Sequence, residues 1–145
     1  FMIAVILAKV AEMTIFLNPL ESSYQRFGNN KAPRYISWSS ENRSQLVRVP
    51  AAVGEYKRAE LRSPDPAANT YLAFALMIYA SLYGIQNKLE LQDPADINLY
   101  KADADTLAKF EQLPENLKSA CSLANNSDFI KEHIPGVILE IYCNK

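Results

Sequence analysis

The run from Tyr71 to Ile85 constrains the fold most, because these fifteen consecutive residues include no charged side chain. A membrane-spanning helix needs about 20 apolar residues, and one serine, one glycine and three tyrosines dilute this shorter run. A helix that is apolar on every side is stable only where neighbours cover it. The run therefore predicts a long buried helix, which Asp65 or Asn69 can cap at its start.

The composition is that of one globular domain. Of the 145 residues, 49% are hydrophobic and 21% are charged, which is typical of an ordinary folded chain. Fifteen basic and sixteen acidic residues give a formal net charge of −1. Without a basic excess, neither nucleic acid nor an anionic membrane surface is the expected partner.

The chain opens with a second predicted helix, from Phe1 to Leu17. Lys9 and Glu12 interrupt its apolar residues, so it is neither a membrane span nor a signal peptide. Asn18-Pro19 ends it, because the residue before a proline disfavours the helical conformation. A domain rarely begins with its core helix. We therefore expect this chain to be the C-terminal part of a longer protein.

Strand and helix signals predict an α+β fold. Residues 34–39, 45–49 and 56–63 are rich in β-branched and aromatic side chains, and the connections are short enough for an antiparallel meander. Amphipathic helices are expected around 103–112, 114–124 and 127–142. The predicted architecture is an antiparallel sheet flanked by the long buried helix and the C-terminal helices.

The chain has two cysteines and one histidine, residue types that can bind a metal or, for the cysteines, form a disulfide. Cys121 and Cys143 lie far apart in sequence, and we expect them to be buried thiols in a reducing compartment rather than a disulfide. With His133 they are separated by twelve and ten residues, a spacing that matches no compact zinc motif. A zinc site is therefore not predicted.

The segment Arg58-Ala59-Glu60-Leu61-Arg62 carries the strongest chemical signal. In an extended strand Arg58, Glu60 and Arg62 project from one face. A carboxylate between two guanidinium groups can hold a divalent metal while the arginines bind anionic oxygens. The alternative interpretation is a solvated strand face whose ion pairs contribute about 0.2–1 kcal/mol each.

Arg26, Arg43 and Arg48 are among the arginines that precede this segment. Five guanidinium forks around Glu60 suit a negatively charged substrate together with a polyphosphate and its metal. The sequence has no glycine-rich phosphate loop, so the P-loop and dinucleotide-binding folds are not supported.

These residues lie in segments that resemble the C-terminal half of the glutamine synthetase catalytic domain. The resemblance rests on Asn42-Arg43-Ser44, Arg48-Val49-Pro50 and the run from Arg58 to Pro66. It continues, in order and through most of the 145 residues, in Asn18-Pro19, Ser23-Tyr24, Ala32-Pro33, Tyr71 to Ala75, Gly84-Ile85, Asn98 to Tyr100 and Leu113-Pro114.

The resemblance implies an ATP-dependent ligase that forms a C–N bond. ATP phosphorylates the side-chain carboxylate of glutamate, and ammonia then displaces phosphate from the acyl phosphate. It also implies Mg²⁺ or Mn²⁺ as cofactor, a cytoplasmic homo-oligomer, and site roles residue by residue. Glu60 corresponds to a metal ligand on the ATP side. The residues that correspond to nucleotide-phosphate contacts are Arg43, Arg48 and Arg58, and those that hold glutamate are Arg26 and Arg62. The implied catalytic arginines are Arg26, Arg48 and Arg62.

One position departs from the family. A glutamate usually precedes the Ala-Pro pair, on a flap that closes over the substrate and helps to admit ammonium, whereas this chain has Lys31 before Ala32-Pro33. A cation there would repel ammonium and could attract an anionic amine. Either the flap glutamate is absent or the register differs and another residue supplies it.

Three functional alternatives follow. The family's other metal ligands, its adenine-binding segment and its N-terminal β domain lie upstream of the matching region, so we expect residues 1–145 alone to be inert. Within the ligase interpretation, ammonia is the default acceptor and a larger amine, giving a γ-glutamyl amide, is the alternative. A non-catalytic scaffold is the second class. A free-standing anion-binding module is the third, but it explains only the arginines.

Overall fold

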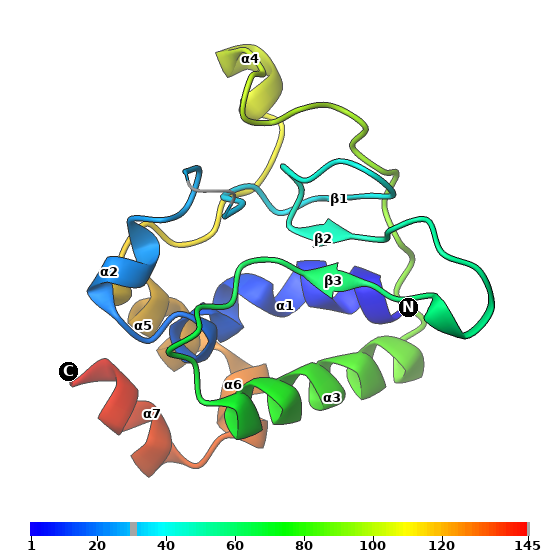
Figure 1. Ribbon diagram of the computed structural model, residues 1–145. Helices are drawn as coiled ribbons and strands as arrows, with labels where there is room; N and C mark the ends of the chain where they lie inside the picture. The colour runs from blue at the N-terminus through cyan, green and yellow to red at the C-terminus, as the bar shows by residue number, and fades with distance from the viewer. Residues whose placement is uncertain (30–31, 145) are drawn as a thin grey trace.

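The computed structural model describes residues 1–29 and 32–144 and has an α+β fold (Figure 1). The sheet lies over α1, with α3 beside α1 and with α5, α6 and α7 grouped toward one end. The elements in chain order are α1 (Met2–Leu17), α2 (Glu21–Tyr24), β1 (Trp38–Ser39), β2 (Val47–Arg48), the 3₁₀ turn η1 (Gly54–Tyr56), β3 (Glu60–Leu61), α3 (Thr70–Gln86), α4 (Ala104–Leu107), α5 (Leu117–Asn126), α6 (Asp128–His133) and α7 (Gly136–Cys143).

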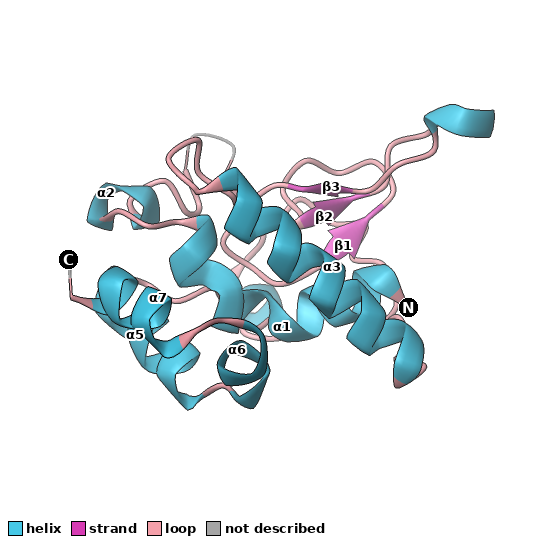
Figure 2. Ribbon diagram, turned by 90° about the horizontal axis from the view of Figure 1, so that it is seen from below, coloured by secondary structure: helices cyan, strands magenta, loops and turns pink. Residues whose placement is uncertain are grey.

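Helix α1 is the centre of the core, as its apolar sequence predicts. Val5, Val10 and Phe16 have no exposed surface, and ten of the helix's residues are buried. The helix packs against both α3 and α5 (Figure 2). It ends at Asn18, whose backbone N–H donates to the Thr14 carbonyl at 2.8 Å. The predicted helix and its stop at Asn18-Pro19 are confirmed.

Helix α3 forms where predicted, and within the described residues only one side of it is buried. The Asn69 side chain caps it by accepting from the N–H groups of Tyr71 and Leu72. Only Leu76, Ala80 and Gly84 are buried. A Cβ on Gly84 would lie 2.7 Å from Val5 Cγ1, so this stripe packs closely on α1.

The opposite side of α3 is an exposed apolar stripe. Tyr71 and Phe74 are 87% and 68% exposed, and Ile78, Leu82 and Ile85 continue the stripe at helical spacing. An apolar sequence shows that a helix can be buried, but it does not say which neighbours are available to cover each face. An exposed apolar patch of this kind marks an interaction surface.

The sheet is mixed, so the predicted antiparallel meander is only half correct. Its order is β1-β2-β3; β2 and β3 are antiparallel, but β1 and β2 are parallel. The chain between β1 and β2 is shaped by side-chain bonds to the backbone. Ser39 Oγ accepts from the N–H groups of Glu41 and Asn42, and Asn42 Oδ1 accepts from the Ser44 N–H. Such bonds compete with a strand ladder, and each strand is only two residues long.

The C-terminal helices are shorter than predicted. The helix expected over 103–112 is the single turn α4, and the one expected over 127–142 is divided into α6 and α7. The break lies at Ile134-Pro135, where Ile134 is extended (φ −119°, ψ 122°). Proline at 135 disfavours a helical conformation at the preceding residue. Across residues 1–29 and 32–144, we find no helix with the length and apolarity that a membrane span requires.

The prediction of two free thiols is wrong, because Cys121 and Cys143 form a disulfide. Their Cα atoms are 5.4 Å apart, within the usual range for such a bond. Cys121 lies on α5 and Cys143 ends α7, and these helices pack together. A separation of 22 residues in sequence does not reveal this contact, because it depends on the turn at Pro135.

Reducing this disulfide should lower the free energy of unfolding by about 3 kcal/mol, because the bond closes a 22-residue loop. Urea unfolding with and without a phosphine reductant measures the change. A Cys121→Ser variant should have the lower stability and should not respond to reductant. Equal stability of the wild-type chain under both conditions would contradict the bond.

Candidate functional site

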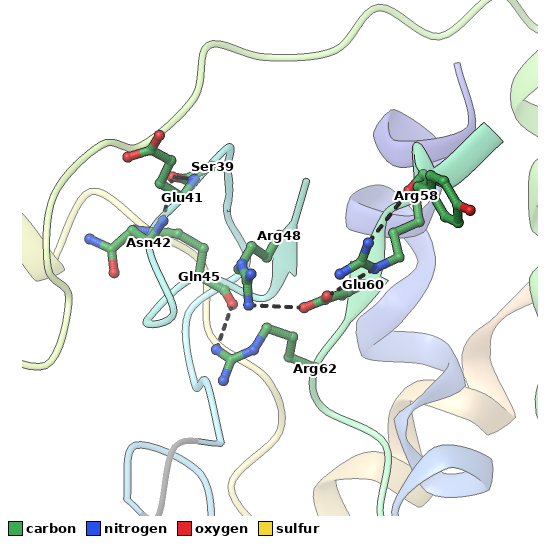
Figure 3. Close-up of polar contacts among 9 residues, drawn as sticks. Ser39, Glu41, Asn42, Gln45, Arg48, Arg58, Glu60 and Arg62 are labelled. Carbon is green, nitrogen blue, oxygen red and sulfur yellow. Dashed lines mark hydrogen bonds and ion pairs between the residues drawn. The ribbon is translucent and has the colours of Figure 1, made fainter. Parts of the chain in front are cut away.

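Glu60 lies between two arginines because of the strand register. The antiparallel pairing of β2 and β3 places Arg48 directly opposite Glu60. Arg48 Nη1 lies 3.2 Å from Glu60 Oε2, and Arg58 Nε lies 3.3 Å from Oε1 (Figure 3). Each carboxylate oxygen thus has one guanidinium partner. The sequence placed Arg58 beside Glu60, but it gave no register from which to identify Arg48 as the second partner.

The same register separates a polar face from the core face. Val47 pairs with Leu61 one position away; Val47 is buried and Leu61 packs against the core. Because side chains alternate along a strand, Arg48 and Glu60 face the other way and remain partly exposed. Burial of Val47 and Leu61 therefore presents the charged pair on the opposite surface.

Arg62 is part of this charged surface but does not form the expected direct ion pair with Glu60. Its Nη1 donates to the Gln45 carbonyl at 3.5 Å, and Figure 3 shows it beside Arg48. Burial lowers the pKa of the Arg62 guanidinium; Tyr100 and Glu60 act to raise it, whereas Arg48 and Arg43 lower it. A cation disfavoured by burial and by like charges is stabilised when an anion binds.

Tyr100 is a neighbour of the arginines that sequence reasoning missed as a site residue. Burial raises the pKa of its phenol, and the nearby Arg62 cation lowers it in part. The net increase keeps Tyr100 neutral and able to donate a hydrogen bond at neutral pH. Tyr100 lies in one of the segments that carry the family resemblance, but the sequence assigns it no role, because its proximity to Arg62 depends on how the 96–100 segment docks.

Hydrogen bonds join that segment to the loop that carries Arg43. Ser39 Oγ donates to Asp96 Oδ1 at 3.0 Å, the Leu99 N–H donates to Ser44 Oγ at 2.8 Å, and Gln45 Nε2 donates to the Ile97 carbonyl at 2.8 Å. Arg43 itself is exposed. The loop therefore has a rigid base and an exposed cation. Sequence reasoning identified Arg43 but not the serines that fix its loop.

Arg26 belongs to a separate cluster. Its Nε lies 3.1 Å from Asp65 Oδ2, and its Nη2 donates to Asn18 Oδ1 at 2.8 Å and to the Ser63 carbonyl at 3.0 Å. Ser63 directly follows Arg62, so the two clusters share a backbone segment. The structure thus gathers Arg48, Arg58, Glu60 and Arg62, with Arg43 at the edge, and places Arg26 next to them along the chain. Lys31 lies outside the described residues.

A metal ion would find only part of a site here. In the described part of the chain, no three His, Cys, Asp or Glu side chains are grouped to hold a metal. The Glu60 carboxylate keeps lone pairs beyond those that its two arginines use, so it fits the role of one oxygen ligand. Magnesium and similar ions need several oxygen ligands, and groups outside this cluster must supply them. The arginine forks match phosphate or carboxylate oxygens.

Comparisons with known proteins find relatives along the whole chain. The family model described as the glutamine synthetase catalytic domain matches residues 1–145. The glutamine synthetase of Methanosarcina mazei is 44% identical over 130 residues, which is 88% of this chain and 29% of the relative. That of Staphylococcus aureus strain MW2 is 37% identical over 142 residues, 96% of this chain and 32% of the relative.

A solved structure of a GmaS/ADP complex shares the fold. It has a TM-score of 0.84 and 27% sequence identity, and the match covers 99% of this chain and 33% of that one. The chain therefore spans 29–33% of the length of these relatives. The predicted resemblance to the family is confirmed.

Glu60→Gln should cost little stability in the 145-residue chain. Exposed cross-strand ion pairs contribute about 0.2–1 kcal/mol, so urea unfolding should show a loss of no more than about 1 kcal/mol. Leu61→Ala on the core face is the matched control and should cost more. A loss of several kcal/mol from Glu60→Gln would mean that the charged pair serves mainly to hold the sheet together.

Proposed function

The chain belongs to the glutamine synthetase catalytic-domain family, and from this premise we propose that it forms part of the active site of an ATP-dependent carboxylate–amine ligase. In the proposed reaction, the γ-phosphoryl group of ATP passes to the side-chain carboxylate of glutamate. Ammonia then attacks the acyl phosphate, phosphate leaves, and glutamine forms. The observation that carries the proposal is the placement of Glu60 between Arg48 and Arg58, with Arg62 alongside.

The nucleotide half of the proposal uses Arg43, Arg48, Arg58 and Glu60. Guanidinium forks bind phosphate oxygens in pairs and stabilise charge on a transferring phosphoryl group. Glu60 would be one ligand of Mg²⁺ or Mn²⁺, and the bound metal neutralises phosphate charge. Binding of ADP by the structural neighbour GmaS supports a nucleotide site on this fold. To bind metal, Glu60 must share its oxygens between the metal and its two arginines.

The glutamate half uses Arg26 and Arg62. Burial and the neighbouring Arg48 and Arg43 disfavour the cationic form of Arg62, and a carboxylate bound beside it would favour that form. Tyr100, held neutral, can donate to the same anion. A cavity of about 350 Å³ lies beside Tyr100 and Ser44 and extends to Gly28 and Asn29, which provides space next to Tyr100.

We further propose that activity needs a longer polypeptide. Glu60 is a single carboxylate, and the relatives are about three times the length of this chain. Residues 1–145 alone would therefore be inert. The exposed stripe of α3 is a surface on which the rest of such a protein can pack. Assembly into a homo-oligomer and a cytoplasmic location are what the family implies.

A larger amine is the second candidate acceptor, and the observation that favours it is Lys31. This cation stands at the sequence position where the family carries a flap glutamate. A lysine there repels ammonium and attracts an amine that bears a carboxylate. The rest of the mechanism is unchanged, because the acyl phosphate is formed by the same arginines and metal.

Phosphate release tests the proposal in the longer protein that contains this chain. The assay supplies ATP, glutamate and magnesium, and compares ammonia with a panel of organic amines. We expect glutamate-dependent phosphate release with ammonia. Turnover with an organic amine only would select the second candidate. No turnover with any amine would contradict a ligase and favour the non-catalytic scaffold.

In that protein, Glu60→Gln should reduce turnover by about 100-fold or more, because the metal loses a charged ligand. Arg62→Lys should also be severe, since a point charge cannot replace the bidentate fork. Glu55→Gln, an exposed change in η1, is the control and should retain activity. Near-normal turnover of Glu60→Gln would rule out the metal role.

Lys31→Glu tests the choice of amine. If residue 31 occupies the flap position, the substitution should raise the ratio of kcat/KM for ammonia over that for carboxylate-bearing amines, because a cation is replaced by an anion. Lys57 is exposed, and Lys57→Glu makes the same charge change there and should leave the ratio unchanged. An equal ratio in the wild type and Lys31→Glu would remove Lys31 from the site.

A further inference from the structure

The Arg26 cluster leaves one edge of a guanidinium group open. An arginine has five N–H donors: one on Nε and two on each Nη. Asp65 Oδ2 lies 3.1 Å from Nε, and Asn18 Oδ1 and the Ser63 carbonyl accept the two donors of Nη2. Within residues 1–29 and 32–144, no acceptor binds Nη1. The side chain is 29% exposed, so the free edge is accessible.

The residues that contact the Arg26 guanidinium group are themselves held in place. Asp65 donates its backbone N–H to the Leu17 carbonyl at 2.8 Å, and its Oδ1 accepts from the Ala67 N–H at 2.7 Å. Its other oxygen is thereby directed at Arg26. Asn18 is fully buried at the end of α1. The loop after β3 and the end of α1 lie side by side (Figure 1), and both supply partners to Arg26.

Three buried polar atoms of the cluster lack a hydrogen-bond partner. Asn18 Nδ2, Ser63 Oγ and Arg26 Nε have none among the described residues, although the Asp65 carboxylate lies beside Nε. Buried polar groups are nearly always paired, and leaving one unpaired lowers stability. Asn18 thus uses its oxygen on Arg26 while its own amide donors stay unsatisfied.

We propose that Asp65 and Asn18 are positioning residues, which hold Arg26 so that its free Nη1 edge binds the carboxylate of glutamate. This inference rests on the proposed function, in which Arg26 contacts glutamate. An unrestrained arginine samples many rotamers and loses that freedom when it binds an anion. The Asp65 ion pair beside Nε and the two hydrogen bonds of Nη2 remove much of that freedom in advance, so substrate binding does not have to.

Asp65→Asn is the direct test in the longer protein. Asparagine keeps Oδ1 for the Ala67 N–H, so the local turn survives, but it turns an NH₂ group toward Arg26 Nε. We expect KM for glutamate to rise by about tenfold, with KM for ATP and the thermal midpoint nearly unchanged. Asp128→Asn removes the same charge at the exposed start of α6 and should change neither KM.

A double-mutant cycle shows whether Asp65 acts through Arg26. Arg26→Lys keeps the charge but removes the fork. If the inference holds, Asp65→Asn adds little to the glutamate KM in the Arg26→Lys background, because coupled residues are non-additive. If the two substitutions instead raise the KM for glutamate independently, so that their fold-changes multiply, the inference is wrong. An unchanged KM for glutamate in Asp65→Asn alone would also overturn it. Failure of the wild-type protein to use glutamate would instead refute the proposed function.

Discussion

The antiparallel register that pairs Arg48 with Glu60 is the constraint on which the rest of the site depends. Because side chains alternate along a strand, a slip of one residue would turn the charged pair into the core and expose Val47 and Leu61. Burial of Val47 opposes that slip. The core therefore sets where the charges lie, and Arg58 and Arg62 follow from their places along β3 and its continuation.

The two arginine clusters are joined by one short stretch of backbone. Residues 62–65 run from the Glu60 surface to the end of α1, where the Asp65 N–H meets the Leu17 carbonyl. A shift of α1 would therefore move the acceptors of Arg26 and the strand that carries Glu60 together. In the proposed ligase this connection would keep the phosphate-binding arginines and the glutamate-binding arginines in fixed positions relative to one another.

The amino-acid sequence predicted the features that depend on a local pattern of residues. The apolar runs specified α1 and α3, Asn69 capped α3, and the spacing of charges predicted the surface around Glu60. What it missed depends on contacts between distant segments. The parallel pairing of β1 follows from the Ser39 turn, and Tyr100 reaches Arg62 only through docking of 96–100. The Cys121–Cys143 bond requires α7 to return against α5, and the open face of α3 reflects which neighbours are present.

Diffraction from the longer protein with ADP and Mn²⁺, recorded with anomalous scattering from manganese, tests whether Glu60 and its arginines bind the metal and the nucleotide. We expect an anomalous peak within coordination distance of the Glu60 carboxylate, with ADP phosphate oxygens on the guanidinium groups of Arg48 and Arg58. Manganese and ADP bound elsewhere, with Glu60 still paired only to Arg48 and Arg58, would contradict it. The pair would then be an ordinary ion pair on a strand surface.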